Sequence, residues 1–162
     1  MREQFTIARG DKGIRQTMRW IIDLGADYHG KVFWRTMAIC YPPRILDSYL
    51  RSRWLYVPDE QDGQPAETIR TLDRLAADVT RTGKFEGDCD DAAVAAVAVV
   101  LQYRHSLKAA ALVVARPAAD PDFTCGHVFC VAADESGSFR VDPTAPIDAD
   151  YTAWEKMQLS LF

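Results

Sequence analysis

The sequence has no long hydrophobic run and no large excess of charge of either sign, and both absences exclude classes of protein. The longest apolar stretch, Ala92 to Leu101, is about half the length that a membrane-spanning helix needs, and it is rich in alanine. The formal net charge is −4 over 162 residues, which gives no electrostatic support for a nucleic-acid partner. We therefore expect neither a membrane nor a nucleic acid among the partners of this chain.

The first residues also lack a targeting pattern. Met1 to Phe5 shows no positively charged start followed by an apolar core, which is the pattern of a secretory signal. We therefore expect synthesis in the cytoplasm, where thiols stay reduced. Hydrophobic residues make up 48% of the chain, an ordinary value for a globular protein, and the length suits one domain spanning residues 1–162.

Cysteine and histidine are scarce, so each can be considered separately. Cys40 lies in an apolar stretch and is expected to be a small buried side chain. His29 and His105 fall near expected helix ends and are expected at the surface. The remaining members of the two sets are Cys89, Cys125, Cys130 and His127.

A metal site remains one interpretation of this part of the sequence. Cys125 and Cys130 lie on either side of His127, a spacing that permits zinc binding, although structural zinc sites usually combine two short pairs of ligands. An acidic cluster of Asp88, Asp90 and Asp91 is the other candidate ligand set. We expect no metal or other cofactor, and keep metal binding as an alternative.

The N-terminal half has the pattern of a helical region. Apolar residues at helical spacing predict helices over 13–24, 32–40, from Pro42–Pro43 to about Trp54, and 67–81. Gly25 and Gly83 are expected to end the first and the last of these helices. The basic residues between Arg44 and Arg53 are expected to form a solvated helix face.

The second half predicts one buried helix followed by strands. The helix expected from Asp90 to Leu107 is apolar on every side over 92–101, so it belongs at the centre of the domain. Strands are expected over 110–115, 127–132 and 138–142, the last two joined by a hairpin. The predicted fold is α+β, with a helical part (1–85), a core of helix and antiparallel sheet (86–144) and an extension (145–162) that packs back or meets a partner.

The most informative motif, Gly87-Asp88-Cys89-Asp90-Asp91, lies at the expected start of the buried helix. Helix N-termini carry unsatisfied N–H groups and partial positive charge, which stabilise both a thiolate and an oxyanion beside it. The flanking carboxylates oppose this effect, because nearby negative charge disfavours the thiolate. A cation is needed to offset them, and His127 as an imidazolium is the candidate.

His127 begins one expected strand, and Asp142 ends the strand that follows it. Because a short hairpin joins the two strands, the Asp142 carboxylate is expected to accept a ring N–H of His127 and fix its orientation. Each residue also has an ordinary structural explanation: a buried thiol, a strand histidine and a turn aspartate before Pro143. A fold that brings Cys89, His127 and Asp142 together predicts a catalytic triad.

The order of these segments resembles the transglutaminase-like superfamily of cysteine enzymes, and more narrowly the small transglutaminase-like proteins of phages and prophages. The resemblance covers residues 86–144 and is carried by the motif at Cys89, by His127-Val128-Phe129 and by Val141-Asp142-Pro143-Thr144. It implies a papain-like core in which Cys89 is the nucleophile, His127 the general base and acid, and Asp142 the orienting residue.

The same resemblance implies how substrate would be held. The oxyanion would be bound by the Cys89 backbone N–H and by a donor from upstream, for which Trp54 and Tyr56 are the candidates, while Asp88 is a further candidate for substrate contact. Two extra thiols beside His127, at Cys125 and Cys130, depart from the expected pattern without removing a triad member.

The implied activity is thiol-dependent acyl transfer on a peptide or protein substrate. Hydrolysis of a peptide or amide bond is favoured over transamidation, because no large substrate-organising domain is present to exclude water. The alternative is a catalytically silent structural or assembly protein of a phage particle, with phage structural proteins as partners and a place in the virion. The sequence leaves the oligomeric state open.

Overall fold

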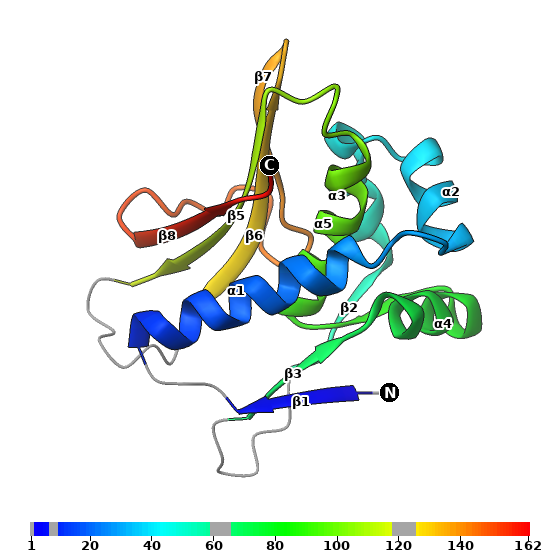
Figure 1. Cartoon of the computed structure of the whole chain (residues 1–162), viewed down its shortest axis with the longest axis horizontal. Helices are drawn as coiled ribbons and strands as arrows, with labels where there is room; N and C mark the ends of the chain where they lie inside the picture. The colour runs from blue at the N-terminus through cyan, green and yellow to red at the C-terminus, as the bar shows by residue number, and fades with distance from the viewer. Residues whose placement is uncertain (1, 7–9, 59–65, 118–125) are drawn as a thin grey trace.

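The computed structural model describes residues 2–6, 10–58, 66–117 and 126–162, and it has the α+β architecture that the sequence predicts (Figure 1). The helices lie mostly in the first part of the chain and the main sheet in the last part. The five helices of the described residues are α1 (Gly10–Ala26), α2 (Val32–Cys40), α3 (Pro43–Arg53), α4 (Leu72–Thr82) and α5 (Cys89–Gln102).

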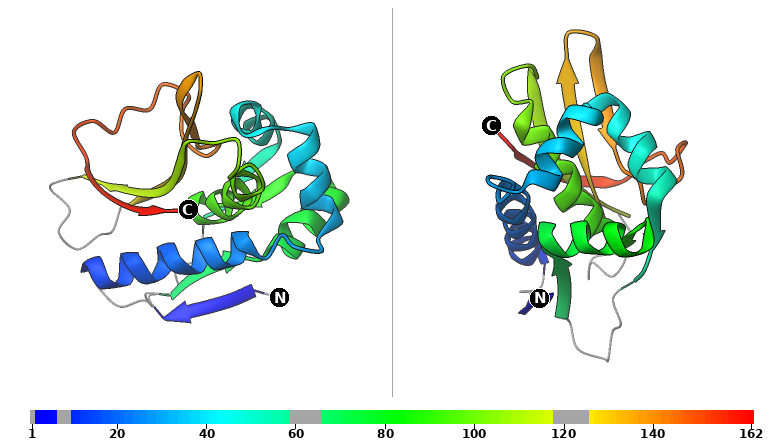
Figure 2. Two further views of the ribbon diagram at one scale, coloured as in Figure 1. Left: turned by 45° about the horizontal axis from the view of Figure 1, so that its top comes forward. Right: turned by 90° about the vertical axis from the view of Figure 1, so that its right-hand side faces the viewer.

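Helix α5 is the centre of the domain, as its apolar sequence predicts. Every residue from Ala92 to Val100 is buried, and the helix contacts all four other helices as well as strands β5 (Ala109–Arg116) and β6 (His127–Asp134). The sheet lies on one side of α5 and helices α2 to α4 on the other (Figure 2). A helix that is apolar all round has no face to offer to water, so only a surrounded position satisfies it.

Helix α1 packs closely on α5, and a glycine makes this possible. A Cβ built on Gly25 would lie 2.5 Å from Cγ1 and 2.7 Å from Cβ of Val97. The expectation that Gly25 ends the helix is wrong, because α1 continues through it to Ala26. Gly83 does end α4: its φ is 75°, and its N–H bonds to the Val79 carbonyl.

The main sheet has the strand order β7-β6-β5-β8, and every neighbouring pair is antiparallel. Strands β6 and β7 (Gly137–Val141) form the predicted hairpin, with Asp134 opposite Gly137. Strand β8 (Glu155–Ser160) pairs with β5, so the C-terminal extension packs back on the domain. Leu112, Val128 and Cys130 face α5, because alternate residues of a strand point to the same side.

Two short strand pairs were not predicted. Strand β1 (Arg2–Thr6) pairs antiparallel with β3 (Ala66–Arg70), and β2 (Trp54–Tyr56) pairs parallel with β4 (Phe85–Gly87). The expectation of a helix from residue 67 is therefore wrong at its start. Helix α4 begins only after Thr71, whose hydroxyl accepts the Arg74 N–H at 3.3 Å.

The basic face expected on α3 is not simply solvated. Arg44 contacts Asp134 at 2.6 Å and donates to the Gly137 carbonyl at 2.8 Å, so it ties α3 to the β6–β7 hairpin. Arg51 is half-buried and reaches the backbone of the segment after β7. Arg44 and Arg53 are exposed as expected, but the contacts of Arg44 and Arg51 were not predicted, because sequence alone does not show that a sheet hairpin lies against the helix.

The exposure of single residues follows the predictions only in part. Cys40 is exposed, contrary to expectation, since it faces outward at the end of α2. His29 and His105 are exposed as expected. Trp34 is fully buried in the core, with its indole N–H bonded to the Leu72 carbonyl at 2.9 Å. In the described part of the chain, no helix is both long and apolar enough to cross a bilayer.

Candidate active site

Cys89 is the first residue of α5, and a capping box of two aspartates fixes its position. The Asp88 carboxylate accepts the backbone N–H of Asp90 at 3.0 Å and of Asp91 at 3.5 Å, while Asp91 Oδ2 accepts the Asp88 N–H at 3.3 Å. Cys89 is half-buried. The thiol therefore lies at the positive end of the central helix, where a thiolate is stabilised.

Gly87 allows the backbone conformation that leads into the N-terminus of helix α5. Its φ is 152°, a backbone conformation that side chains disfavour, and a Cβ there would lie 2.6 Å from the Asp91 Cβ and closer still to Asp91 Oδ2. Strand β2 also fastens this turn, because the Val57 N–H bonds to the Gly87 carbonyl at 3.0 Å. The glycine thus allows Asp91 to pack under the turn that presents Cys89.

A network of buried charged side chains packs against the turn that presents Cys89. Arg70 is 5% exposed, and its guanidinium lies 3.3 Å from Asp78 and 3.6 Å from Asp91, both buried. The Arg70 backbone N–H also donates to Asp91 Oδ1 at 2.6 Å, and its guanidinium donates to the Glu86 carbonyl. Burial raises the pKa of Asp91 to about 7, the negative charge of Asp88 acts in the same direction, and Arg70 opposes both.

This raised pKa predicts a pH dependence of stability. Because the pKa of Asp91 is about 7 in the folded chain against 3.8 as its ordinary value, the folded state binds more protons between these values. The free energy of unfolding should then fall as pH rises through this interval, by up to ~1.4 kcal/mol per pH unit. Urea unfolding between pH 4.5 and 8 measures it, and Asp91→Asn should flatten the decline.

The control for this experiment is Asp148→Asn, which changes an exposed carboxyl group. It should keep the wild-type dependence on pH. An equal decline in the wild type and in Asp91→Asn would show that another group is responsible.

His127 and Asp142 form the second part of the site. His127 Nε2 lies 2.7 Å from Asp142 Oδ1, and the Asp142 side chain is 1% exposed. The second carboxylate oxygen lies 3.5 Å from the Tyr151 hydroxyl and 3.6 Å from Arg140 Nε. Since Asp142 engages Nε2, Nδ1 is the ring nitrogen left for proton exchange with a nucleophile.

Helix α3 positions the backbone of Asp142, which the sequence did not predict. The Asp142 N–H donates to Asp47 Oδ1 at 2.6 Å, and Arg51 donates to the Asp142 carbonyl at 2.7 Å and to that of Ala145. Asp47 and Arg51 also pair with each other at 3.1 Å across one helical turn. The i, i+4 spacing of Asp47 and Arg51 was visible in the sequence. Their contacts with the Asp142 backbone, which lies 91 or more residues further along the chain, were not.

Tyr151 contacts both members of the His127–Asp142 pair. Its ring stacks on that of His127, with centroids 5.4 Å apart, and its hydroxyl faces Asp142. Burial raises the pKa of Tyr151 to about 12, and the negative charges of Asp142 and, more weakly, of Cys89 add to this.

The negative charge that the sequence places beside the thiol is present in the structure. Cys89 Sγ lies 3.7 Å from Asp90 Oδ1, within hydrogen-bonding distance for sulfur. A thiol that donates to a carboxylate is held in its protonated form. The Asp90 carboxylate therefore opposes formation of the thiolate.

The candidate oxyanion donors lie on the strand beside this turn. Trp54 donates its indole N–H to the Gly87 carbonyl at 2.9 Å, so in this structure that N–H is engaged in holding the turn. Tyr56 lies opposite Gly87 in the β2–β4 pair and is 55% exposed. The Asp88 carboxylate is a helix cap and an acceptor, so it supplies no donor to an oxyanion.

The structure bears differently on the two candidate metal sites, the one around His127 and the acidic cluster. His127 and Cys130 point to opposite faces of β6: the thiol is buried against α5, where burial raises its pKa to about 12, so these two do not form one zinc site. Cys125 lies outside the described residues. Within the described part of the chain, ligand atoms of Asp88, Cys89 and Asp90 lie within 4.8 Å of one another, while Asp91 is directed to Arg70.

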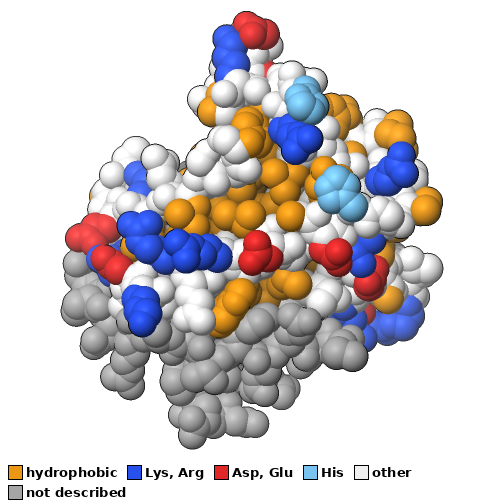
Figure 3. Space-filling view, viewed as in Figure 1, with side chains coloured by type: hydrophobic (Ala, Val, Ile, Leu, Met, Phe, Trp, Pro, Cys, Tyr) orange, Lys and Arg blue, Asp and Glu red, His pale blue; other side chains and the backbone are white. Residues whose placement is uncertain are grey.

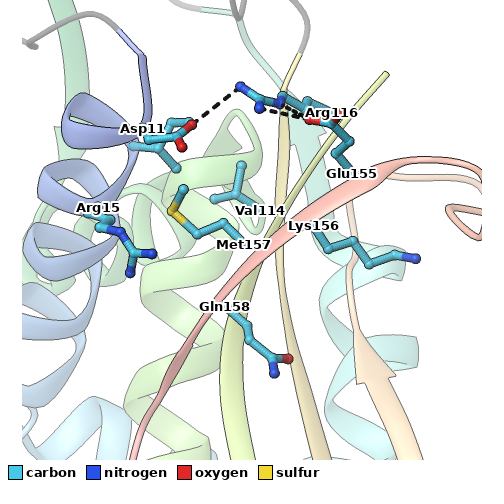
Figure 4. A pocket seen from close by; sticks show the side chains of 9 residues that line it. Asp11, Arg15, Val114, Arg116, Glu155, Lys156, Met157 and Gln158 are labelled. Atoms are coloured by element: carbon cyan, nitrogen blue, oxygen red, sulfur yellow. Dashed lines mark hydrogen bonds and ion pairs between the residues drawn. The ribbon is translucent and has the colours of Figure 1, made fainter. Parts of the chain in front are cut away.

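A groove outside this site lies between α1 and β8 (Figure 4). Its most prominent cation, Arg116, is already paired with Glu155 at 2.7 Å and with Asp11 at 3.5 Å. Basic side chains also gather over α1, where Lys12, Arg15 and Arg19 are exposed (Figure 3). None of the triad candidates lines this groove.

Comparisons of the chain with protein families, with curated proteins and with solved structures find no match. The structure itself defines an α+β domain whose central helix begins at a cysteine, with a bonded histidine–aspartate pair and a tyrosine that contacts both members of that pair.

Proposed function

We propose that this protein is a thiol-dependent acyl-transfer enzyme with a papain-like core, in which Cys89 is the nucleophile, His127 the general base and acid, and Asp142 the orienting residue. The observation that carries the proposal is the 2.7 Å contact between His127 Nε2 and the buried Asp142, in a site that also holds a cysteine at the start of the central helix. A cysteine at a helix start, a histidine and an orienting carboxylate are the parts that thiol catalysis requires.

The reaction begins with transfer of the Cys89 thiol proton to His127 Nδ1. The thiolate then adds to the carbonyl carbon of an amide, and the oxyanion that forms is stabilised by the positive end of α5, including the Cys89 backbone N–H. When the C–N bond breaks, His127 returns the proton to the leaving amine, and a thioester remains on Cys89. Water, deprotonated by His127, attacks the thioester carbonyl. The C–S bond then breaks, the Cys89 sulfur regains the proton from His127, and the carboxylic acid is released.

Asp142 serves this cycle by fixing the imidazole. Its bond to Nε2 requires the proton on that nitrogen in the neutral ring, which leaves the Nδ1 lone pair free to accept the thiol proton. Its charge also stabilises the imidazolium that forms. Because the Asp142 backbone is held by Asp47 and Arg51, the carboxylate stays in place throughout the cycle.

Hydrolysis of a peptide or amide bond is the outcome that we propose first, with transamidation second. The proposed substrate is a peptide or protein, and the resemblance to phage proteins makes a phage or prophage setting our proposal for its origin. The proposed site of synthesis is the cytoplasm, with later association with the virion.

A second candidate function is a catalytically silent assembly or structural protein that keeps this fold. The contact between Cys89 Sγ and Asp90 Oδ1 favours it, since a thiol held by a carboxylate is a poor nucleophile. The two functions differ in whether an acyl group is carried on Cys89.

Acylation by p-nitrophenyl acetate, a general acyl donor, separates them. The wild type should release p-nitrophenol rapidly and carry an acetyl group on Cys89, which water then removes faster than an added amine does. Cys89→Ala should lose both the release and the label. Cys40→Ser, which removes an exposed thiol instead, should keep both. Equal acylation in Cys89→Ala and the wild type would contradict the proposed activity.

A further inference from the structure

The segment that follows Asp142 is held over the site by two arginines. Arg51 donates to the carbonyls of Asp142 and Ala145, at the start of this segment. Arg140 donates to the Ala149 carbonyl at 2.9 Å and to the Ile147 carbonyl at 3.4 Å, further along it. These bonds fix the backbone that leads to Tyr151, so the place of this side chain is determined by the fold.

The Tyr151 ring is also packed against several other rings. Its ring centroid lies 5.4 Å from that of His127 and 5.1 Å from that of Phe129, with nearly parallel planes in both cases. Trp154 meets its ring edge-on at 5.1 Å, and the Arg140 guanidinium lies 5.3 Å from its centroid. Aromatic pairs at these distances attract one another and favour particular orientations of the rings.

The Tyr151 hydroxyl adds a polar contact to this packing. It lies 3.5 Å from Asp142 Oδ2, the oxygen that His127 does not use. Because the pKa of Tyr151 is raised to about 12, the phenol stays protonated and remains a donor at any pH at which the enzyme would work. The carboxylate is thus held at both oxygens, and its plane is fixed relative to the imidazole.

We infer that Tyr151 is a positioning residue for His127 and Asp142: its ring sets the plane of the imidazole, and its hydroxyl holds the second oxygen of the carboxylate. This inference rests on the proposed function, because it assigns Tyr151 a part in the same site. Arg140 completes the arrangement, as it contacts Asp142 Oδ2 at 3.6 Å and holds the backbone before Tyr151.

The test compares three variants by NMR of the histidine rings, which are only three in this chain. Tyr151→Phe keeps the ring and should leave the His127 chemical shifts unchanged, while the pH midpoint of the His127 titration rises because Asp142 loses a neutral donor. Tyr151→Leu should change both the chemical shifts and the midpoint. Tyr103→Phe is the matched control, since it removes a hydroxyl that donates to the Ala38 carbonyl at 2.7 Å, away from the site.

The result that would overturn the inference differs from the result that would overturn the proposed function. Wild-type midpoints in Tyr151→Phe, together with wild-type shifts in Tyr151→Leu, would overturn it; if the leucine variant does not fold, the phenylalanine variant decides alone. The proposed function would fail in a different way: the wild type would show no acyl transfer, while the NMR differences between the wild type and the Tyr151 variants would still be seen.

Discussion

Among the described glycines at a positive φ, Gly87 is expected to be the one whose replacement by alanine destabilises the protein most. The backbone there has φ of 152°, which costs a residue with a Cβ about 1–3 kcal/mol. The new Cβ would also overlap Asp91, whose own Cβ lies 2.6 Å from its position, and crowding of a packed site costs about 1–3 kcal/mol more. Together these predict a fall in melting temperature on the order of 10 °C, measured by circular dichroism.

Gly83→Ala separates the two causes. Its φ is also positive, at 75°, but nothing lies within 4 Å of the position of its Cβ. This variant should show only the backbone cost. A Gly87→Ala protein that melts no lower than Gly83→Ala would mean that Asp91 is free to move, and that the support described for the Cys89 turn is not rigid.

The sequence predicted the elements whose pattern is strong and local. Helix α5 was evident because a run from Ala92 to Val100 has no polar face, and the β6–β7 hairpin was evident because a turn sequence separates two apolar strands. The pairing of His127 with Asp142 followed from that hairpin. These predictions needed only neighbours along the chain.

The features that were missed depend on distant contacts or on weak patterns. Strands β2 and β4 have three residues each, too few for an alternating pattern to show. The close packing of Gly25 against Val97 cannot be inferred from the sequence of the helix, because a glycine near the end of a helical pattern usually indicates the C-terminus of the helix. Nor does the sequence reveal that Arg51 crosses to the backbone of Asp142.

The residues of the candidate site also fall into those that the sequence predicted and those that it did not. Residue types and order predicted Cys89, His127 and Asp142, whereas Arg70 and Tyr151 carried no local sign of their roles. Arg70 is an ordinary strand residue until the fold buries it against two aspartates, and Tyr151 lies nine residues beyond Asp142 in a segment without regular structure. A tertiary contact was needed to find each of them.

Replacing His127 with alanine is expected to change how the reactivity of Cys89 depends on pH. With His127 present, proton transfer from the thiol gives a thiolate–imidazolium pair, so the midpoint for alkylation should lie below pH 7. Without the imidazole, Asp88 and Asp90 remain as the nearest charges and disfavour the thiolate, so the midpoint should move to about pH 8.5 or above. Labelling by iodoacetamide, followed by peptide mass spectrometry, measures it.

The midpoint is a better measure than the rate at one pH. A thiolate of low basicity is also a weaker nucleophile, with a Brønsted coefficient of about 0.4–0.5, so the gain in thiolate fraction is partly cancelled in the rate. The chain supplies internal references: Cys40 is exposed and open to the reagent, and buried Cys130, with its pKa raised to about 12, should resist labelling. His105→Ala, which removes an exposed histidine elsewhere, is the matched control.

The central claim is that Cys89 and His127 act as one unit, and the alkylation profile of Cys89 in the wild type and in His127→Ala tests it most directly. The account predicts a wild-type midpoint below pH 7 that rises by more than one unit in the variant and is unchanged in His105→Ala. A wild-type midpoint near that of Cys40, unmoved by His127→Ala, would contradict it and favour the catalytically silent protein.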